Sequence, residues 1–345
     1  MTSKKPGHWR KNDRLSSVTF WKEKEFFKGK QIDAGVVIIR TCGCSYFISL
    51  GGCSMCGFNL DSRSDTTPEQ VLNQFETAAN ELGDVQLLKV YTSGSFLDER
   101  EIPRAVASKI LNHCKDRGIR LLFESRPEYV TEENVERVQG AHDNLQVALG
   151  LESSNDRILE YSINKGFSVR DYDRAAGLMH ERGIPIRTYV LLKPPYLTES
   201  EALNDAISTA THAATYSEAI SINPVNVQRG TLVERLWRNW SYRPPWLWSV
   251  LGLVRSAKEL DRHILCDPVG GGRERGSHNC GQCDEAILHG LKAFSTTQDY
   301  GKLGSPQCSC NETWRALMDI EELVIGGTCD LQRFFTRRDQ RSKMH

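Results

Sequence analysis

The sequence lacks a long hydrophobic run, although it contains 345 residues. A helix that crosses a bilayer needs roughly 20 consecutive apolar residues, and the longest candidate, residues 246–254, has about half that length. Residues 1–14 are basic but lack the apolar stretch of a secretory signal. We therefore expect a cytoplasmic protein that has no membrane partner.

Net charge is also absent, because 44 Lys and Arg residues balance 44 Asp and Glu residues. This balance argues against a generic polyanion-binding protein. The basic residues are nevertheless concentrated near the two ends, in residues 4–30 and 333–343. Such ends either contact nucleic-acid phosphates or form solvated tails, and the composition does not decide between the two.

Cysteine, in contrast, is frequent, with 11 in the chain. The cytoplasm keeps thiols reduced, so clustered cysteines indicate metal or redox chemistry and not a disulfide framework. Apolar residues make up 39% of the chain, enough for a substantial core. The length suits one domain of the size of a β/α barrel together with a smaller appendage.

Short β-branched runs alternate with amphipathic helical stretches, a pattern that predicts a parallel sheet. Six strands are predicted, at residues 36–41, 87–92, 120–124, 145–149, 186–192 and 219–223. Five helices are predicted between them, at residues 68–82, 102–117, 131–139, 169–182 and 199–216. We predict a basic N-terminal arm (residues 1–30), a β/α body (31–230) and a cysteine-rich C-terminal region (231–345).

The loop after the first predicted strand holds the first cysteine cluster. Cys53 and Cys56 form a Cys-x-x-Cys pair there, with Cys42 and Cys44 upstream. With a third thiolate from the same loop, this pair would leave one iron of a four-iron cluster without a protein ligand. A structural zinc site and a dithiol redox site are the alternatives. We expect the glycines of this loop to wrap closely round a cluster at positive φ: Gly43, Gly51, Gly52 and Gly57.

This loop resembles the cluster loop of radical S-adenosylmethionine (SAM) enzymes related to the elongator catalytic subunit. It reads Thr41-Cys-Gly-Cys44 and then Gly51-Gly-Cys-Ser-Met-Cys-Gly57. Further matches follow in order: Tyr91-Thr-Ser-Gly-Ser-Phe96, Glu124-Ser-Arg-Pro-Glu128, Gly150-Leu-Glu-Ser153, Asn164-Lys-Gly166 and Leu192-Lys-Pro-Pro195. Within that superfamily the likeness to the archaeosine-forming radical enzymes, the RaSEA family, extends over almost the whole chain. The resemblance implies an α/β fold, a partial (β/α)6 radical SAM barrel with a small cysteine-rich C-terminal domain.

The resemblance also implies the cofactors, a [4Fe-4S] cluster and SAM. Cys44, Cys53 and Cys56 would hold the cluster, with Cys42 as the alternative to Cys44. A ligand with an ammonium, a carboxylate and a ribose needs polar partners. We expect these partners at the ends of three strands: Thr92, Ser93, Gly94 and Ser95, then Glu124 and Arg126, then Glu152 and Ser153. An ordinary turn is the alternative for residues 92–95, and a structural ion pair is the alternative for Glu124 and Arg126.

The substrate side is assigned to the last two strand ends of the predicted body. Lys193 either binds a carboxylate or phosphate or is a solvated lysine, and Asn223, Gln228 and Arg229 are placed on the same face. No catalytic acid or base is predicted.

A second cysteine cluster lies near the C-terminus, at Cys280, Cys283, Cys308 and Cys310. Two close thiolate pairs suit a tetrahedral structural zinc site. A second iron-sulfur cluster and unligated thiols are the alternatives, and Cys266 and His278 are further candidate ligands. Residues 235–248, upstream, interleave arginines with aromatic residues, which indicates either an RNA contact or a packing seam.

The resemblance implies a radical SAM lyase that acts in tRNA modification. Such an enzyme cleaves the lysine C–N bond of a 7-formamidino-lysine-7-deazaguanosine adduct in the tRNA D-loop and so forms archaeosine. It implies tRNA, the lysine-transferring enzyme ArcS and an electron donor as partners. The alternatives are another radical SAM tRNA-modifying enzyme and a non-catalytic zinc protein that binds RNA.

Overall fold

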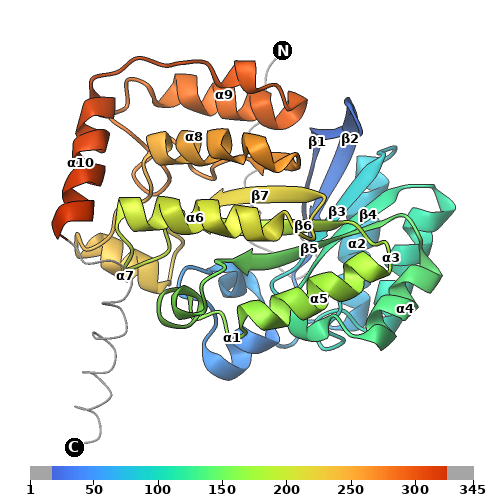
Figure 1. Cartoon of the computed structure of the whole chain (residues 1–345). Helices are drawn as coiled ribbons and strands as arrows, with labels where there is room; N and C mark the ends of the chain where they lie inside the picture. The colour runs from blue at the N-terminus through green and yellow to red at the C-terminus, as the bar shows by residue number, and fades with distance from the viewer. Residues whose placement is uncertain (1–17, 325–345) are drawn as a thin grey trace, which may run out of the picture.

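An eight-stranded sheet forms the centre of the computed structural model, which describes residues 18–324 (Figure 1). The strands are β1 (Thr19–Phe27), β2 (Lys30–Ile38), β3 (Leu87–Tyr91), β4 (Arg120–Ser125), β5 (Leu145–Glu152), β6 (Ile186–Leu192), β7 (Ala219–Pro224) and β8 (His263–Cys266). They lie side by side in chain order. β1 pairs antiparallel with β2, and the other neighbours pair parallel. This order forms an open half-barrel and confirms the predicted α/β class.

All six predicted strands are present, as β2 to β7, and the sheet has two more. β1 falls within the predicted basic arm, where its many charged residues hide the strand pattern. It is held by its antiparallel register with β2, in which Thr19 faces Ile38 and Phe27 faces Lys30. β8 has only four residues, too few for a periodic signal. The basic residues 4–17 and 333–343, and Cys329, lie outside the described residues.

The five predicted helices cross between the strands on the outer face of the curved sheet (Figure 1). They are α2 (Pro68–Leu82), α3 (Arg104–Asp116), α4 (Glu132–Ala141), α5 (Val169–Glu181) and α6 (Glu199–Ala213). Capping boxes at Thr67, Ser168 and Thr198 begin three of them. These crossovers leave the carboxyl ends of the strands free, which is the edge where a barrel carries its site.

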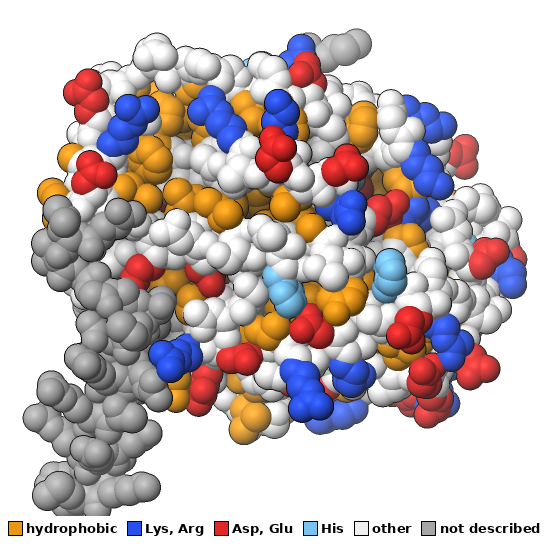
Figure 2. Space-filling model, viewed as in Figure 1, with side chains coloured by type: hydrophobic (Ala, Val, Ile, Leu, Met, Phe, Trp, Pro, Cys, Tyr) orange, Lys and Arg blue, Asp and Glu red, His pale blue; other side chains and the backbone are white. Residues whose placement is uncertain are grey.

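The region after residue 230 packs on the same sheet. It contains α7 (Leu232–Arg238), α8 (Leu247–Ser256), α9 (Asp284–Thr297) and α10 (Cys310–Val324). β8 pairs with β7, α8 packs against α6, and α9 reaches β1 and β2. None of the helices in residues 18–324 is long and apolar enough to cross a bilayer. On the face that Figure 2 shows, acidic and basic side chains are interspersed, as the zero net charge leads one to expect.

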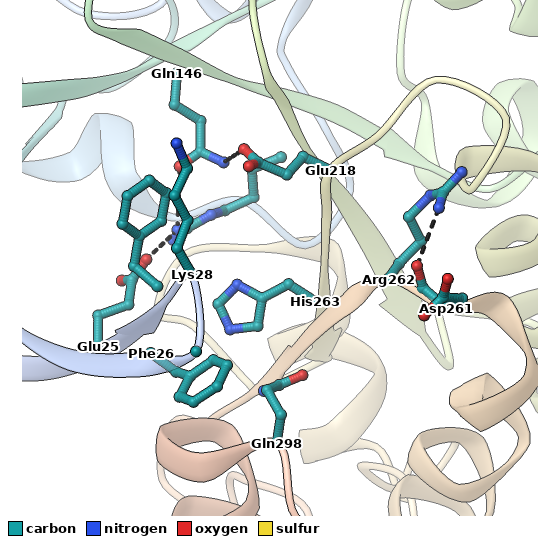
Figure 3. A pocket seen from close by; sticks show the side chains of 12 residues that line it. Glu25, Phe26, Lys28, Gln146, Glu218, Asp261, Arg262, His263 and Gln298 are labelled. Atoms are coloured by element: carbon teal, nitrogen blue, oxygen red, sulfur yellow. Dashed lines mark hydrogen bonds and ion pairs between the residues drawn. The ribbon is translucent and has the colours of Figure 1, made fainter.

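Charged side chains fill the half-barrel on the side opposite to the carboxyl ends of the strands (Figure 3). Glu25 of β1 forms ion pairs with Lys89 of β3 and Arg187 of β6, and all three are buried. They adjoin a cavity of about 310 Å³ whose lining includes Gln146 and His263. The hairpin of β1 and β2 thus supplies the anion that neutralises two cations inside the sheet.

The Glu25 ion pairs predict a loss of stability in acid. Burial opposes ionisation of this carboxyl, but Arg187 and Lys89 outweigh it and lower the pKa of Glu25 to about 2, from an ordinary 4.5. A depressed carboxyl pKa stabilises the fold above about pH 4.5, and that contribution is lost as the pH falls toward 2. Thermal unfolding between pH 7 and pH 2.5 should show this loss, up to about 3 kcal/mol, in the native chain. The Glu25→Gln variant, already destabilised at pH 7, should lose less over the same range, and parallel curves for the two proteins would contradict the assignment.

Candidate functional site

The loop after β2 brings the predicted cluster cysteines to the carboxyl edge of the sheet. Cys44 directly precedes α1 (Ser45–Leu50), and Cys53 and Cys56 lie between α1 and the short 3-10 helix η1 (Phe58–Asp61). Burial raises the pKa values of Cys53 and Cys56, the latter to about 12, and the nearby Cys44 adds to both shifts. A dithiol redox site needs a lowered thiol pKa, so these raised values favour cysteines that become thiolates only with a metal.

Cys42 lies in a different environment from Cys44. Its thiol donates to the carbonyl of Arg100 at 3.0 Å. After burial, Glu101 and Asp98 are the main causes that raise the Cys42 pKa. Cys44, in contrast, acts electrostatically on both Cys53 and Cys56. Cys44 therefore stays the expected third ligand beside the Cys-x-x-Cys pair.

The loop glycines follow the expectation at three positions of four. Gly43, Gly51 and Gly52 have φ values of 102°, 83° and 72°. The expectation was wrong for Gly57, whose φ is −106°. Gly57 is instead required by a close approach, because an added Cβ would lie 3.0 Å from the Cβ of Gln228.

The loop after β3 folds around a buried carboxylate, Glu101. The backbone N–H groups of Ser93, Gly94 and Ser95 donate to this carboxylate at 2.7, 3.0 and 2.6 Å. The hydroxyl of Thr41 also donates to it at 2.7 Å, and the side chain of Glu101 is 2% exposed. The amides are occupied, and the hydroxyls of Ser93 and Ser95 are hydrogen-bonded to Ser62 and Ser125, so the backbone carbonyl oxygens are the groups of this loop that a ligand would contact. The sequence analysis missed Glu101, and its position among neighbouring acidic residues gave no signal.

Gly94 places the loop after β3 directly against the cysteine loop. An added Cβ would lie 2.9 Å from both Cα and Cβ of Cys44. Gly94→Ala should therefore displace Cys44 and reduce SAM cleavage about 100-fold, since misplacing a reacting group by about 1 Å has effects of this order. Measured iron content should fall with it.

Gly177→Ala is the matched control for Gly94→Ala. Gly177 lies in α5, and an added Cβ there meets nothing within 4 Å. This variant should keep its iron and its activity and gain slightly in stability. Normal iron content and activity in Gly94→Ala would disprove the contact.

Two buried cations lie beside the cysteines. Lys165 forms an ion pair with Glu152 at 2.8 Å, and both side chains are buried. Arg126 donates to the carbonyl of Lys165 at 3.1 Å and stacks on the ring of Tyr46, 4.4 Å from its centroid. Both cations lower the pKa of Cys53 against the effect of burial. A cluster held by three thiolates is anionic, so the residues present fit such a group electrostatically.

Glu124 and Arg126 do not form the structural ion pair that was the alternative to cofactor contact. Arg126 pairs instead with Glu128. Glu124 accepts a hydrogen bond from the hydroxyl of Tyr189 at 2.9 Å, and burial raises its pKa to about 7. The two residues have different partners, with Glu124 inside β4 and Arg126 just after its end.

Thr92 and Ser153 are both buried and engaged in local hydrogen bonds. The Thr92 hydroxyl accepts the N–H of Gly94 at 3.4 Å. The Ser153 hydroxyl donates to Asp205 of α6 at 2.8 Å and accepts the N–H of Asn155 at 3.1 Å. These bonds fix the loops after β3 and β5.

The four residues expected on the substrate side lie in different settings. Lys193 is buried and forms an ion pair with Glu199 at 2.5 Å, so it is not a solvated lysine. Asn223 accepts a hydrogen bond from Ser221 at 3.1 Å. Gln228 accepts the N–H of Gly57 at 2.6 Å, next to Cys56. Arg229 is exposed at the same edge.

The four C-terminal cysteines come together in space. The Sγ atoms of Cys280, Cys283, Cys308 and Cys310 all lie within 4.8 Å of one another. Cys280 lies 3.5 Å from Cys308, and Cys283 lies 3.6 Å from Cys310. The structure thus confirms the second cluster as a group able to hold a metal.

Two cysteines of the second cluster lie at the starts of helices. Cys283 is the N-cap of α9, and Cys310 is the first residue of α10. A helix N-terminus stabilises negative charge, which favours a thiolate. The two further candidates, Cys266 in β8 and His278, do not belong to the group.

Most of residues 235–248 form a packing seam. Tyr242 donates to the carbonyl of Lys193 at 2.7 Å, and the indole of Trp248 donates to the Sγ of Cys310 at 3.2 Å. Arg243 stacks on Trp246, 4.1 Å from the ring centroid. Trp240 is the exception among the aromatic residues, because it is 96% exposed, and Arg235 and Arg238 are exposed as well.

A largely parallel half-barrel whose first parallel strand is followed by a cysteine-bearing loop is the arrangement of radical SAM enzymes. The family model for the Radical SAM superfamily matches residues 38–206 of this chain. Archaeosine synthase subunit beta of Methanosarcina acetivorans is 39% identical over 89% of this chain and 91% of that protein. The protein of the same name from Thermococcus kodakarensis is 35% identical over 91% of this chain and 99% of its own length. The chain therefore belongs to the archaeosine synthase subunit beta family.

A solved structure with a similar arrangement is the archaeal Methanocaldococcus infernus Elp3 with an N-terminal deletion. It is 16% identical, with a TM-score of 0.45, over 68% of this chain and 56% of that chain.

Proposed function

We propose that this chain is a radical SAM lyase of tRNA modification, which cleaves the lysine C–N bond of the 7-formamidino-lysine-7-deazaguanosine adduct and leaves archaeosine. The observation that carries the proposal is the match to archaeosine synthase subunit beta over nearly the whole length of two relatives. The grouping of Cys44 with Cys53 and Cys56 supports the radical chemistry that this reaction needs. The bond to be broken is unactivated, so ionic acid-base catalysis offers no easy route to it.

In this proposal Cys44, Cys53 and Cys56 hold a [4Fe-4S] cluster. When bound, the cluster and SAM supply a 5′-deoxyadenosyl radical. Glu101 fixes the loop of residues 92–95 by accepting hydrogen bonds from three of its amides, so a cationic ligand would meet the carbonyl oxygens of this loop. Lys165 and Arg126 offset the negative charge of the thiolates. Glu124, Glu152 and Ser153 stay assigned to the cofactor side.

Gln228 and Arg229 remain the substrate-side residues that lie nearest to the cysteine loop. The N–H of Gly57 donates to Gln228, so a substrate that moves Gln228 also acts on the loop that carries Cys56. We assign Lys193 and Asn223 a less direct part in substrate binding. The charge of Lys193 is already neutralised by its ion pair with Glu199. They stay part of the proposal as residues that shape the same edge of the sheet.

We assign the second cysteine group to a single zinc ion. Four sulfurs at about 2.3 Å from one zinc ion lie about 3.8 Å from one another. The distances of 3.5 and 3.6 Å in the two closest pairs suit such a tetrahedron. A four-iron cluster needs wider spacing, because each thiolate binds a different iron.

The partners in this proposal are tRNA, ArcS and an electron donor. The word "subunit" in the names of the relatives supports an assembly with a second protein. ArcS would attach the lysine that this chain removes, so the two activities need the same tRNA nucleoside in succession.

The proposal is tested with anaerobically reconstituted protein, a reductant, SAM and tRNA that carries the lysine adduct. We expect 5′-deoxyadenosine and archaeosine to form together, and about four irons per chain on the first cluster. If 5′-deoxyadenosine forms but the adduct persists, another tRNA-modifying radical enzyme is the better description. If SAM is not cleaved at all, a non-catalytic zinc protein that binds RNA would replace the proposal.

A further inference from the structure

We propose that the exposed face of α7 and the residue Trp240 form a docking surface for RNA beside the cysteine loop. We call it the α7 surface and define it by Arg229, Arg235, Arg238 and Trp240. The inference rests on the proposed function and adds to it the place where the tRNA is held outside the reacting nucleoside.

Trp240 is exposed in a way that packing does not explain. Its side chain is 96% exposed, whereas Tyr242 and Trp248 of the same segment are buried. Its backbone has a φ of 58°, a region that bulky residues rarely occupy. Hydrogen bonds from the N–H groups of Trp240 and Ser241 to the carbonyls of Trp237 and Leu236 hold this turn. The fold therefore keeps a large aromatic face in solvent, where a base is able to stack on it.

The arginines give the α7 surface a positive charge. Arg235 and Arg238 are three positions apart, so they share one face of α7, and both are exposed. Arg229 is exposed just before the helix. The acidic residue of α7, Glu234, is buried and already paired with Arg238 and with Arg275. The α7 surface thus carries three arginines, and the one carboxylate of α7 is buried, on a chain whose overall charge is zero.

The α7 surface adjoins the cysteine loop. The N–H of Val233 in α7 donates to the carbonyl of Ser54, between Cys53 and Cys56, at 3.4 Å. An added Cβ at Gly230 would lie 3.2 Å from Leu60 of η1. The seven residues of α7 span about 10 Å. Trp240 follows this helix, so a few nucleotides of RNA would bridge the distance from Trp240 to the cysteine loop. A base stacked on Trp240 would flank a nucleotide that enters the site.

RNA fits the α7 surface better than a protein partner does. Solvent-exposed aromatic and guanidinium groups together suit bases and phosphates. A protein partner would instead need acidic groups opposite the arginines, and no feature of the described residues indicates such a partner. Single-stranded loops present such unstacked bases, and the proposed substrate nucleoside lies in a loop.

The test compares tRNA binding by Trp240→Ala with that by Trp21→Ala. Trp21 is also an exposed tryptophan, 41% exposed, but it lies on β1 at the far edge strand of the sheet. Filter binding uses the full chain and tRNA carrying the lysine adduct. We expect Trp240→Ala to weaken binding about tenfold or more, as loss of one stacked base does. Trp240→Phe should keep most of the affinity, and Trp21→Ala all of it.

A second variant separates charge from stacking. Arg235→Gln combined with Arg238→Gln should weaken tRNA binding and make its salt dependence shallower, because fewer counterions are released. SAM cleavage without RNA should stay within about twofold of the native value in these variants, since residues 235–240 lie outside the cysteine loop.

Three outcomes overturn the inference. Native affinity for tRNA in Trp240→Ala, measured on protein with native unfolding temperature, would remove Trp240 from RNA binding. Retained tRNA binding with lost binding of a partner protein would make the α7 surface a protein interface. If the native chain cleaves SAM but binds no tRNA, both the proposed function and the docking surface are wrong. The measurement on the native chain alone distinguishes this outcome from the other two.

Discussion

Exchange of Cys44 for serine is expected to abolish the first cluster, whereas exchange of Cys42 is expected to leave it intact. The two residues are two positions apart and have the same chemistry, so the contrast depends on geometry alone. Cys44 acts electrostatically on Cys53 and Cys56, while Cys42 donates to the carbonyl of Arg100. Serine cannot replace a thiolate ligand to iron, so Cys44→Ser should lose nearly all iron and all SAM cleavage.

The measurements for this pair are iron and sulfide content after anaerobic reconstitution, and 5′-deoxyadenosine formation in the presence of reductant. Cys53→Ser serves as the reference for a lost ligand, because it belongs to the Cys-x-x-Cys pair. If Cys42→Ser loses the cluster and Cys44→Ser keeps it, the ligand assignment is reversed and the loop must rearrange when it binds iron. If Cys42→Ser and Cys44→Ser both keep the iron-sulfur cluster, the cluster is bound outside this loop.

Cys283→Ala is expected to empty the second metal site and to destabilise the C-terminal helices. Cys283 caps α9, and its sulfur lies 3.6 Å from that of Cys310 at the start of α10. A bound ion therefore ties two helices together, and structural zinc sites contribute directly to folding free energy. We expect less than a tenth of the native zinc content and a loss of roughly 3 kcal/mol, about 5–10 °C in Tm.

Cys266→Ala is the matched control for Cys283→Ala. Cys266 is buried in β8 in the same region but does not belong to the metal group. It should keep one zinc ion per chain and lose only the small packing contribution of its own sulfur. A chelator should lower the Tm of the native chain and of Cys266→Ala, but not lower that of Cys283→Ala further. Iron in place of zinc in the native chain would contradict the tetrahedral assignment.

Two features of the structure could not be predicted from the sequence: the ion pairs of Glu25 and the contact of Gly94 with Cys44. Glu25 lies in a stretch that reads as a charged arm, and only the pairing of β1 with β2 carries it to Lys89 and Arg187. Gly94 was expected in the cofactor loop, but its reason for being glycine is the backbone of Cys44, 50 residues earlier. Neither partner is visible from spacing along the chain.

Local interactions made most of the fold readable from the sequence. The period of the apolar residues, the caps at Thr67, Ser168 and Thr198, and the glycines between segments located six strands and five helices. The Cys-x-x-Cys pair and the motifs at strand ends indicated the class of chemistry, because these ligands are close in sequence. Such signals act over a few residues and need no knowledge of long-range contacts.

The sequence by itself determined a parallel α/β sheet with six of its eight strands and the two cysteine clusters as candidate metal sites, and the resemblance at the strand ends implied the partial barrel. Only the tertiary structure decided that Arg126 pairs with Glu128 and not with Glu124, and that Glu101 holds the loop after β3. It also separated Trp240 from its buried neighbours in one aromatic segment. The physical reason is that burial and charge pairing depend on which strand ends meet in space, and sequence spacing does not contain that distance.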